Sequence, residues 1–242
     1  MPEPMREKIT QRIARTALSC FFGCLAILMV VIPASGADKA KDEDTIKNAN
    51  LVLQNMLDTN SVSPAVLSKA ACVMILPGVK KVGFGVGGTG GRGPMVCRRG
   101  ANFTGRWSAP AMFTIGGASV GFQVGGSSSD IVLLMMHPKV VTQVLNGKTK
   151  MGTDATAAAG PGATAASASD ADIYTYAKAK GAFAGVSLGG ATIEPDNDAN
   201  HRLYDKTLTA TEIVRGTDVA PEGEGEALVA VLDKRVSKKH GE

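Results

Sequence analysis

A glycine-rich segment occurs three times in this sequence and constrains the fold more than any other feature. Val82-Gly83-Phe84-Gly85-Val86-Gly87-Gly88 recurs 38 residues later as Val120-Gly121-Phe122-Gln123-Val124-Gly125-Gly126, with six of seven positions identical. A weaker third copy runs from Ala184 to Gly190. In each copy bulky side chains alternate with Gly, Ser or Gln, which predicts a β-strand with one bulky and one nearly bare face. Because glycine weakens a strand, the bare face indicates that another backbone, a helix or a ligand packs closely there.

The first 37 residues have the features of an export signal. Arg6, Lys8, Arg12 and Arg15 form a basic region, residues 17–32 are apolar, and the small residues 34–37 provide a cleavage site. We therefore expect cleavage near Ala37 and a periplasmic or secreted protein, either in solution or peripheral on a membrane. The alternative is an uncleaved membrane anchor, because the apolar run is close to the shortest span of about 17 residues.

Two cysteines, Cys72 and Cys97, remain after the predicted cleavage. In an oxidising compartment they can form a disulfide, which would contribute roughly 3 kcal/mol in the chain-entropy model. The alternative is a pair of buried free thiols, because the sequence does not show whether the two Cα atoms come within bonding distance. The three histidines stand alone, so we expect no metal site and no cofactor.

Hydrophobic periodicity predicts helices at both ends of the mature chain. We expect a charged linker at residues 38–44, an amphipathic helix at Thr45–Leu57, and a final helix at residues 224–236. Short helices are expected to begin at Pro64, Pro138 and Asp196.

The middle of the chain reads as short strands separated by turns. We expect Gly87–Gly93 to be a flexible turn between two strands of an antiparallel meander, and residues 173–177 and 183–193 to form a last hairpin. The expected fold class is α+β: a curved antiparallel glycine-rich sheet or small barrel covered by N- and C-terminal helices. Residues 38–242 then form one domain, with a core at about 44–215.

Basic residues dominate the region around the first two glycine-rich copies. Residues 59–129 contain no Asp or Glu, and six of their basic side chains flank the copies: Lys80, Lys81, Arg92, Arg98, Arg99 and Arg106. Phe103 and Trp107 lie among them. Cationic turns with interleaved aromatic rings suit anionic lipid headgroups, so we expect these cations to bind headgroups and the two rings to contact the membrane. The alternative is chance combined with strand composition, since strands disfavour Asp and Glu. Export argues against nucleic acid as a partner.

Two patterns that resemble catalytic or cofactor motifs lack the required context. Gly83-x-Gly85-x-x-Gly88 matches the dinucleotide-binding fingerprint, but it lies within a predicted strand instead of a strand-to-helix turn. Ser119 stands in a Gly-x-Ser-x-Gly pattern, but a β alternation follows it where a nucleophile elbow needs a helix. We therefore expect a protein that is not an enzyme.

Several ordered motifs give the chain a family resemblance. They are Pro77-Gly78-Val79, Gly83–Gly90, Gly105-Arg106-Trp107-Ser108-Ala109-Pro110, Ser119–Gly125, Gly152–Pro161 and Phe183–Gly190. Together they resemble the SYLF domain, a lipid-binding module, over most of residues 44–204. The resemblance implies binding to phosphoinositides or other anionic lipids, helped by an N-terminal amphipathic helix that corresponds to Thr45–Leu57. In eukaryotic members the domain also associates with actin, which the export signal argues against here.

These observations lead to two hypotheses. The first is an exported, non-enzymatic protein that binds anionic phospholipid or phosphoinositide-type headgroups. The second is a structural or protein-interaction module of the cell envelope, in which the glycine faces pack against the protein's own helices and no lipid is bound.

Overall fold

The computed structural model describes residues 34–147, 149–152, 157–159, 171–181 and 188–237. Most of the predicted export signal lies outside these ranges, so that prediction and the cleavage near Ala37 stay predictions. No helix in the described part of the chain combines the length and the apolar character needed to cross a membrane.

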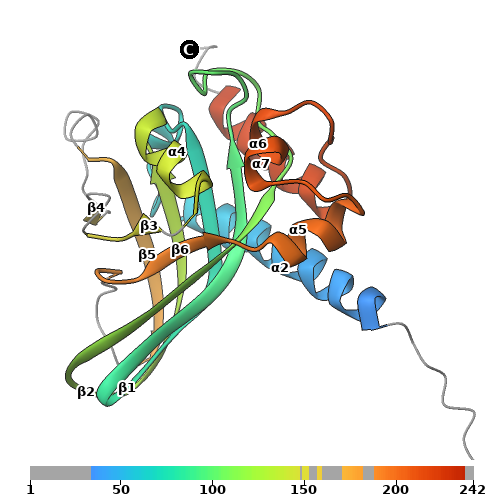
Figure 1. Ribbon diagram of the computed structural model, residues 1–242. Coiled ribbons are helices and arrows are strands. Elements are labelled where there is room, and N and C mark those ends of the chain that lie inside the picture. The colour runs from blue at the N-terminus through green and yellow to red at the C-terminus, as the bar shows by residue number, and fades with distance from the viewer. Residues whose placement is uncertain (1–33, 148, 153–156, 160–170, 182–187, 238–242) are drawn as a thin grey trace, which may run out of the picture. The chain divides into compact units, whose positions relative to one another are not determined.

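The described strands form one six-stranded sheet centred on two long strands (Figure 1). β1 (Cys72–Cys97) pairs antiparallel with β2 (Ala111–Met135) along nearly its whole length. The remaining strands are β3 (Thr149–Lys150), β4 (Ala157–Ala159), β5 (Ile173–Gly181) and β6 (Thr192–Pro195). β5 and β6 both pair antiparallel with β2, β3 pairs antiparallel with β6, and β4 lies parallel to β5. The expected α+β class with a curved, mainly antiparallel sheet is confirmed.

The two long strands, together called the ribbon, fold back on themselves. A straight strand of 26 residues would span about 85 Å. Nevertheless the first and last residues of β1, Cys72 and Cys97, have Cα atoms 4.0 Å apart, and the Arg98 amide donates to the Ala71 carbonyl at 2.8 Å. The pairing with β2 shifts between Phe84 and Val86, at the midpoint of β1. Figure 1 shows both strands turning back at the lower end of the sheet.

The antiparallel register of β1 and β2 makes the first two glycine-rich copies cross-strand partners at the fold-back. Val82 pairs with Gly126, Phe84 with Val124, and Val86 with Val120. We call residues 82–86 with residues 120–126 the ribbon tip. Both copies are therefore strands, as predicted, whereas their pairing with each other was not expected from the sequence. Most of the third copy lies outside the described residues.

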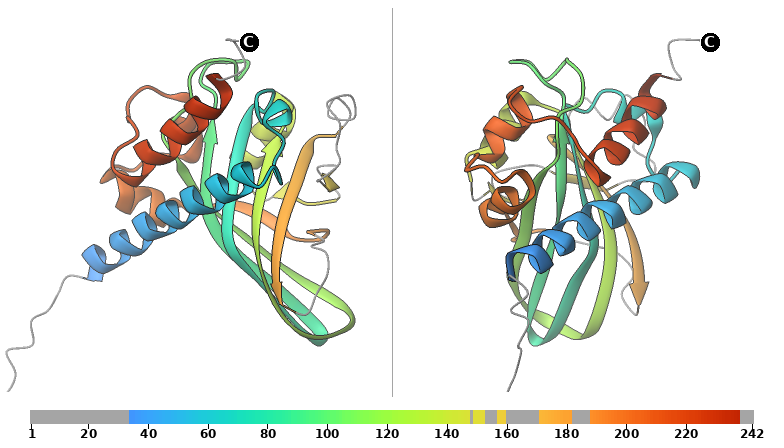
Figure 2. Two further views of the ribbon diagram at one scale, coloured as in Figure 1. Left: turned by 180° about the vertical axis from the view of Figure 1, so that it is seen from behind. Right: turned by 90° about the vertical axis from the view of Figure 1, so that its right-hand side faces the viewer.

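Helices cover the sheet on both faces. The described residues form α2 (Ala34–Asp58), α3 (Pro64–Leu67), α4 (Pro138–Leu145), α5 (Asn197–Tyr204), α6 (Ala210–Arg215) and α7 (Glu224–Ser237). Strand alternation divides the core into two clusters. Val73 and Ile75 pack with side chains of α2, α3 and α7, whereas Met74 and Leu76 pack with side chains of α4 and α6. In Figure 2, right, α2 in blue and α7 in red lie in front of the same side of the sheet. The expected cover by N- and C-terminal helices is confirmed.

The expected charged linker at residues 38–44 is wrong, because this segment belongs to α2. Asp42 is completely buried there. It lies four residues before the buried Ile46 and so continues the inward-facing stripe of the helix. Ion pairs with two arginines, described below, compensate the burial of its charge.

One further local expectation is corrected, and another lies largely outside the described residues. Gly87–Gly93 is not a flexible turn but part of β1, where Gly87 pairs with Ser119 and Gly93 with Phe113. The hairpin expected from residues 173–177 and 183–193 lies largely outside the described residues, because residues 182–187 are not described. The described strands β5 and β6 each pair with a different part of β2. Helix α6 was not predicted, although the Thr209-x-x-Glu212 capping box at its start is a recognisable signal.

Candidate functional site

Three of the predicted headgroup-binding residues lie at the loop that joins β1 to β2. Arg98 stacks its guanidinium group on Trp107, 4.3 Å from the ring centroid, and donates a hydrogen bond to the Gly105 carbonyl at 3.3 Å. Desolvation by burial lowers the pKa of Arg98. The cation is therefore partly used to hold the loop in shape.

Arg99 and Arg106 differ in how far they reach solvent. The Arg99 guanidinium donates to the Val219 carbonyl at 3.1 Å and ties the loop to the segment before α7. The Arg99 amide also donates to the Arg106 carbonyl at 2.8 Å. The Arg106 side chain itself is exposed. Of these three arginines, Arg106 is thus the one best placed to meet a ligand from solvent.

The two aromatic rings of this loop are buried. Phe103 is 2% exposed and Trp107 is 4% exposed. Arg215 covers the Phe103 ring at 4.7 Å from its centroid, as Arg98 covers Trp107. The expectation that these rings contact a membrane is therefore wrong for this fold. Large aromatic rings stabilise a fold most when they are removed from water, and both rings are buried in the core here.

Arg92 lies in a third place and has acidic partners. Its guanidinium pairs with the buried Asp42 of α2, and lies 3.4 Å from the Asp196 carboxylate. Asp42 also accepts from Arg202 of α5 at 2.7 Å. This cluster joins α2, β1 and the start of α5. The role that the structure gives to Arg92 is therefore to neutralise a buried carboxylate.

Lys80 and Lys81 lie on the ribbon, between its base and its tip. Lys80 is exposed and pairs with Ser128, and Lys81 pairs with Ser127. Lys80 is eight residues along β1 from Cys72, which corresponds to about 26 Å of strand. Arg98, Arg99 and Arg106 follow the opposite end of β1, beside Cys72. The six predicted cations therefore do not converge on one site.

The ribbon tip presents apolar side chains to solvent. Val82 is 61% exposed and Val86 is 66% exposed, and together with Leu51 of α2 they are the exposed large hydrophobic residues among the side chains whose burial the structure describes. The alternation in the sequence predicted a bulky face for this strand but not that this face meets water. The signal that could have indicated it for Val82 is the glycine of the second copy, Gly126, which lies opposite and offers no side chain to cover the valine.

Several glycines outside the tip do accommodate close neighbours, and these belong to the protein itself. A Cβ atom at Gly93 would lie 1.9 Å from the Ile75 carbonyl oxygen, and one at Gly91 would lie 2.8 Å from Val79. A Cβ at Gly117 would lie 2.9 Å from the Cα of Ala191. At these positions the bare face therefore packs against the chain's own backbone and side chains, not against a ligand.

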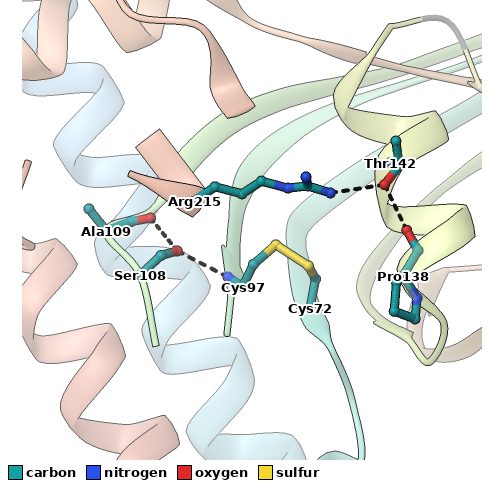
Figure 3. Close-up of a disulfide and its surroundings, with 7 residues drawn as sticks. All are labelled: Cys72, Cys97, Ser108, Ala109, Pro138, Thr142 and Arg215. Carbon is teal, nitrogen blue, oxygen red and sulfur yellow. Dashed lines mark hydrogen bonds between the residues drawn. A yellow bond between two sulfur atoms is a disulfide. The ribbon is translucent and has the colours of Figure 1, made fainter. Parts of the chain in front are cut away.

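A disulfide closes the base of the ribbon (Figure 3). Cys72 and Cys97 are bonded with an S–S distance of 2.06 Å, which decides between the two alternatives left open by the sequence. The Ser108 hydroxyl accepts from the Cys97 amide at 3.1 Å and donates to the Ala109 carbonyl at 2.8 Å. The bond thus joins the two ends of β1 next to the start of β2.

A pocket of about 540 Å³ lies among α2, α5 and the start of α7. Its charged lining consists of Lys39, Glu43, Glu222 and Glu224. The hydroxyl of Tyr204, also in the lining, donates to the Pro110 carbonyl, and burial raises the pKa of this tyrosine. Three carboxylates against one ammonium make this pocket a poor receptor for an anionic headgroup.

The motifs that resembled cofactor and nucleophile sites are strands in the structure. Gly83, Gly85 and Gly88 lie in β1, and Ser119 lies in β2 opposite Gly87. The described residues also contain no group of three or more His, Cys, Asp or Glu side chains arranged to hold a metal ion.

Comparisons with known proteins assign the fold to a family. A family model described as "Ysc84: Las17-binding protein actin regulator" matches residues 116–235. The human SH3 domain-containing YSC84-like protein 1 is 31% identical over 218 residues, which cover 87% of this chain and 62% of the human protein. The chain belongs to the SYLF-domain family.

Other relatives of this SYLF-family chain come from yeasts. Protein YSC84 of Saccharomyces cerevisiae is 31% identical over 208 residues, which cover 78% of this chain and 42% of that protein. An SH3 domain-containing protein of Schizosaccharomyces pombe is 32% identical over 205 residues, which cover 78% of this chain and 46% of that protein. The chain thus spans about half the length of these curated relatives. No solved structure matches it.

The family match covers the second glycine-rich copy of this SYLF domain. It begins at Gly116 in β2 and ends within α7, so it includes one strand of the ribbon tip. The printed names of the family and of the relatives describe binding, regulation or an SH3 domain, and none names an enzymatic activity.

Proposed function

We propose that this SYLF-family protein is a non-enzymatic binding protein that attaches to anionic phospholipid membranes. The observation that carries the proposal is the acid-free stretch of residues 59–129. In the fold it forms α3, β1, the connecting loop and most of β2. The acid-free part of the ribbon and its base is therefore a continuous structural unit that contributes cations but no carboxylates, up to Asp130 in β2. An anionic bilayer attracts such a surface by about 1 kcal/mol per basic residue close to it.

The structure narrows the set of cations that would make this contact. Lys69, Lys80 and Arg106 have exposed side chains. Arg92 neutralises Asp42, and Arg98 and Arg99 hold the β1–β2 loop. Removing those three arginines would therefore disturb the fold together with any binding. Substitution of the exposed cations therefore tests membrane binding without disturbing the fold.

The test is co-sedimentation of the mature protein with vesicles of phosphatidylglycerol and phosphatidylcholine. We expect binding at low salt that weakens as salt screens the charges, and little binding to phosphatidylcholine alone. The triple variant Lys69→Gln, Lys80→Gln, Arg106→Gln should bind several-fold more weakly. The matched control Lys139→Gln, Lys206→Gln, Lys234→Gln removes the same charge outside the acid-free stretch and should bind as the wild type does. Absence of binding to anionic vesicles at low salt would refute the proposal.

Export of the protein is a part of the proposal that the disulfide supports. A disulfide persists in oxidising compartments such as the periplasm or the cell exterior and is rare in a reducing cytosol. The Cys72–Cys97 bond therefore agrees with the export signal at residues 1–37. Fractionation of the host cell, with the N-terminal residue of the recovered protein determined by sequencing, tests this part.

A protein-interaction module is the second candidate function. It is favoured by the description of the matched family, which names Las17 binding and actin regulation. For an exported chain we do not expect actin itself as the partner. This candidate predicts a reproducible cross-linked protein in the host envelope and no vesicle binding, which distinguishes it from the first.

A further inference from the structure

We propose that the ribbon tip is the element that inserts into the membrane, an inference that rests on the proposed function and locates its contact. The two candidates for such an element are the tip, with Val82 and Val86, and α2, with Leu51. Among the side chains whose burial is described, these are the large hydrophobic ones that are exposed. Isolated exposed apolar residues are common on protein surfaces, so exposure alone does not decide between them.

The position of the tip in the sheet favours insertion. β2 pairs with β6 up to Gly116 and with β5 from Ser127 onward. Between these points, among the described residues, it pairs with β1 alone. The tip is thus a two-stranded projection beyond the last described pairs of the neighbouring strands. Figure 1 shows it at the lower end of the sheet, away from the helices.

The backbone and side chains of the tip suit a non-aqueous environment. The cross-strand pairing of β1 with β2 continues on both sides of the fold-back and satisfies the backbone groups that face the partner strand. The groups on the two outer edges need water or headgroups, so the insertion we propose is shallow and stays at the membrane interface. Apart from the two valines, the described side chains beside the fold-back are mostly hydrogen atoms of glycine. Among these described side chains, little polar surface would have to be dehydrated on insertion.

Charge around the tip points to an anionic bilayer as the occupant. Lys80 is exposed two residues before Val82, and the pairs that follow toward the base involve Ser127, Ser128 and Ser129. Asp130, the first carboxylate beyond the acid-free stretch, already accepts a hydrogen bond from the Gly78 amide at 2.9 Å. Apolar side chains at the end with an ammonium group set behind them match the order of hydrocarbon and phosphate in a bilayer.

The competing element, α2, is held against the core by the buried residues on both sides of Leu51. Leu51 is exposed, but Ala49 and Leu53 beside it are completely buried in the core. Glu43 and Asp44, earlier on the helix, are exposed carboxylates that an anionic surface would repel. We therefore expect α2 to stay on the sheet while the tip enters the bilayer.

The test places a tryptophan at each competing position. Val86→Trp and Leu51→Trp are compared in the otherwise intact mature chain, with the wild type reporting the buried Trp107 as background. Vesicles contain phosphatidylglycerol and phosphatidylcholine with brominated acyl chains. We expect the emission of Val86→Trp to shift to shorter wavelength and to be quenched, while that of Leu51→Trp stays unchanged.

Other outcomes separate this inference from the proposed function. Binding with quenching of Leu51→Trp but not of Val86→Trp would assign the contact to α2 and overturn the inference. Binding without quenching at either position would also overturn it, leaving a purely electrostatic surface contact. If the wild-type protein does not bind these vesicles at all, both the proposed function and this inference are overturned.

A second pair of variants measures the contribution of the valines. Val82→Ser with Val86→Ser should reduce partitioning into anionic vesicles by at least about tenfold, because two apolar side chains no longer enter the bilayer. Leu51→Ser is the matched control and should partition as the wild type does. Equal partitioning of all three proteins would count against insertion. Circular dichroism and thermal unfolding should be unaffected, since all three side chains are exposed.

Discussion

Asp42 is a carboxylate without solvent exposure, and two arginines from different parts of the chain neutralise it. Arg92 comes from β1 and Arg202 from α5. Because both arginines remain partly exposed, water compensates part of their charge when the carboxylate is removed. The cluster fixes the N-terminal part of α2 against the sheet through charge instead of apolar packing.

We predict that Asp42→Ala lowers the free energy of unfolding by about 2 kcal/mol or more, since two arginines lose their buried partner. Urea denaturation of the variant and the wild type measures the effect. Glu43→Ala is the control, because Glu43 is the exposed neighbour and its loss should change stability by less than about 0.5 kcal/mol. Equal effects of the two substitutions would show that the buried cluster contributes nothing particular.

Gly93 is required by the fold-back of β1. A methyl group there would overlap the Ile75 carbonyl oxygen, whereas a methyl group at Gly90 of the same strand would meet nothing within 4 Å. We predict that Gly93→Ala destabilises the protein by about 3 kcal/mol or more, because backbone must move. Gly90→Ala should be close to neutral. Thermal unfolding of the two variants tests this, and similar midpoints would contradict the close approach.

At the scale of elements, the sequence predicted whether a segment is a helix or a strand better than it predicted which short strands join into longer ones. Strands around Val82 and Val120 and the helices near Thr45, Pro138 and Glu224 follow from local periodicity, and all are present. The joining of short strands into two long ones does not follow from periodicity. It depends on the close contacts at Gly91 and Gly93, which involve residues more than ten positions away. The glycines of residues 87–93 suggested a turn, whereas Gly91 and Gly93 allow neighbouring parts of the chain to pack closely against the strand.

The capping box of α6 gives a pH-dependent prediction. Hydrogen bonds from the Thr209 amide and hydroxyl lower the pKa of Glu212. A carboxyl with a lower pKa in the folded state stabilises the fold above its unfolded pKa, and this contribution is lost as the pH falls through the folded pKa. Glu212→Gln should therefore unfold at a lower temperature than the wild type at pH 7.

The difference between Glu212→Gln and the wild type should close when the pH falls well below 4.5, the ordinary value for glutamate. Thermal unfolding followed by circular dichroism at several pH values measures it. A difference that stays constant down to about pH 3 would mean that the charge of Glu212 is not what stabilises the helix start.

At the scale of the whole molecule, the two ends of the described chain share one core. Leu53 of α2 and Leu228 of α7 belong to the same hydrophobic cluster on one face of the sheet. The N-terminal helix is therefore an integral part of the fold. This packing also limits how far α2 could leave the sheet to dock on a membrane.

We predict that Leu53→Ala lowers the free energy of unfolding by about 2–5 kcal/mol, as expected for a completely buried leucine. Leu51→Ala, two residues away and 57% exposed, should change it by less than about 0.5 kcal/mol. Urea denaturation of both variants provides the comparison. A small effect at Leu53 would indicate that α2 is only loosely attached.

The candidate site was harder to predict from the sequence than the helices and strands were. The sequence showed the acid-free stretch but not which of its side chains are exposed. Phe103 and Trp107 are buried, and Arg92 forms an ion pair with the buried Asp42. Exposure of a loop residue depends on what packs over it, and here the covering residues come from distant parts of the chain. Arg215, which covers Phe103, lies in α6, a helix that the periodicity did not predict.

The disulfide at the base of the ribbon makes residues 72–97 a covalent ring with the first half of the tip on its far side. A protease that cuts anywhere inside this ring opens it without separating the chain into two pieces. The nicked protein would keep its full mass on a gel until a reductant is added. A cut in the β1 half of the ribbon tip would thus leave both parts tethered, close enough for the strands to pair again.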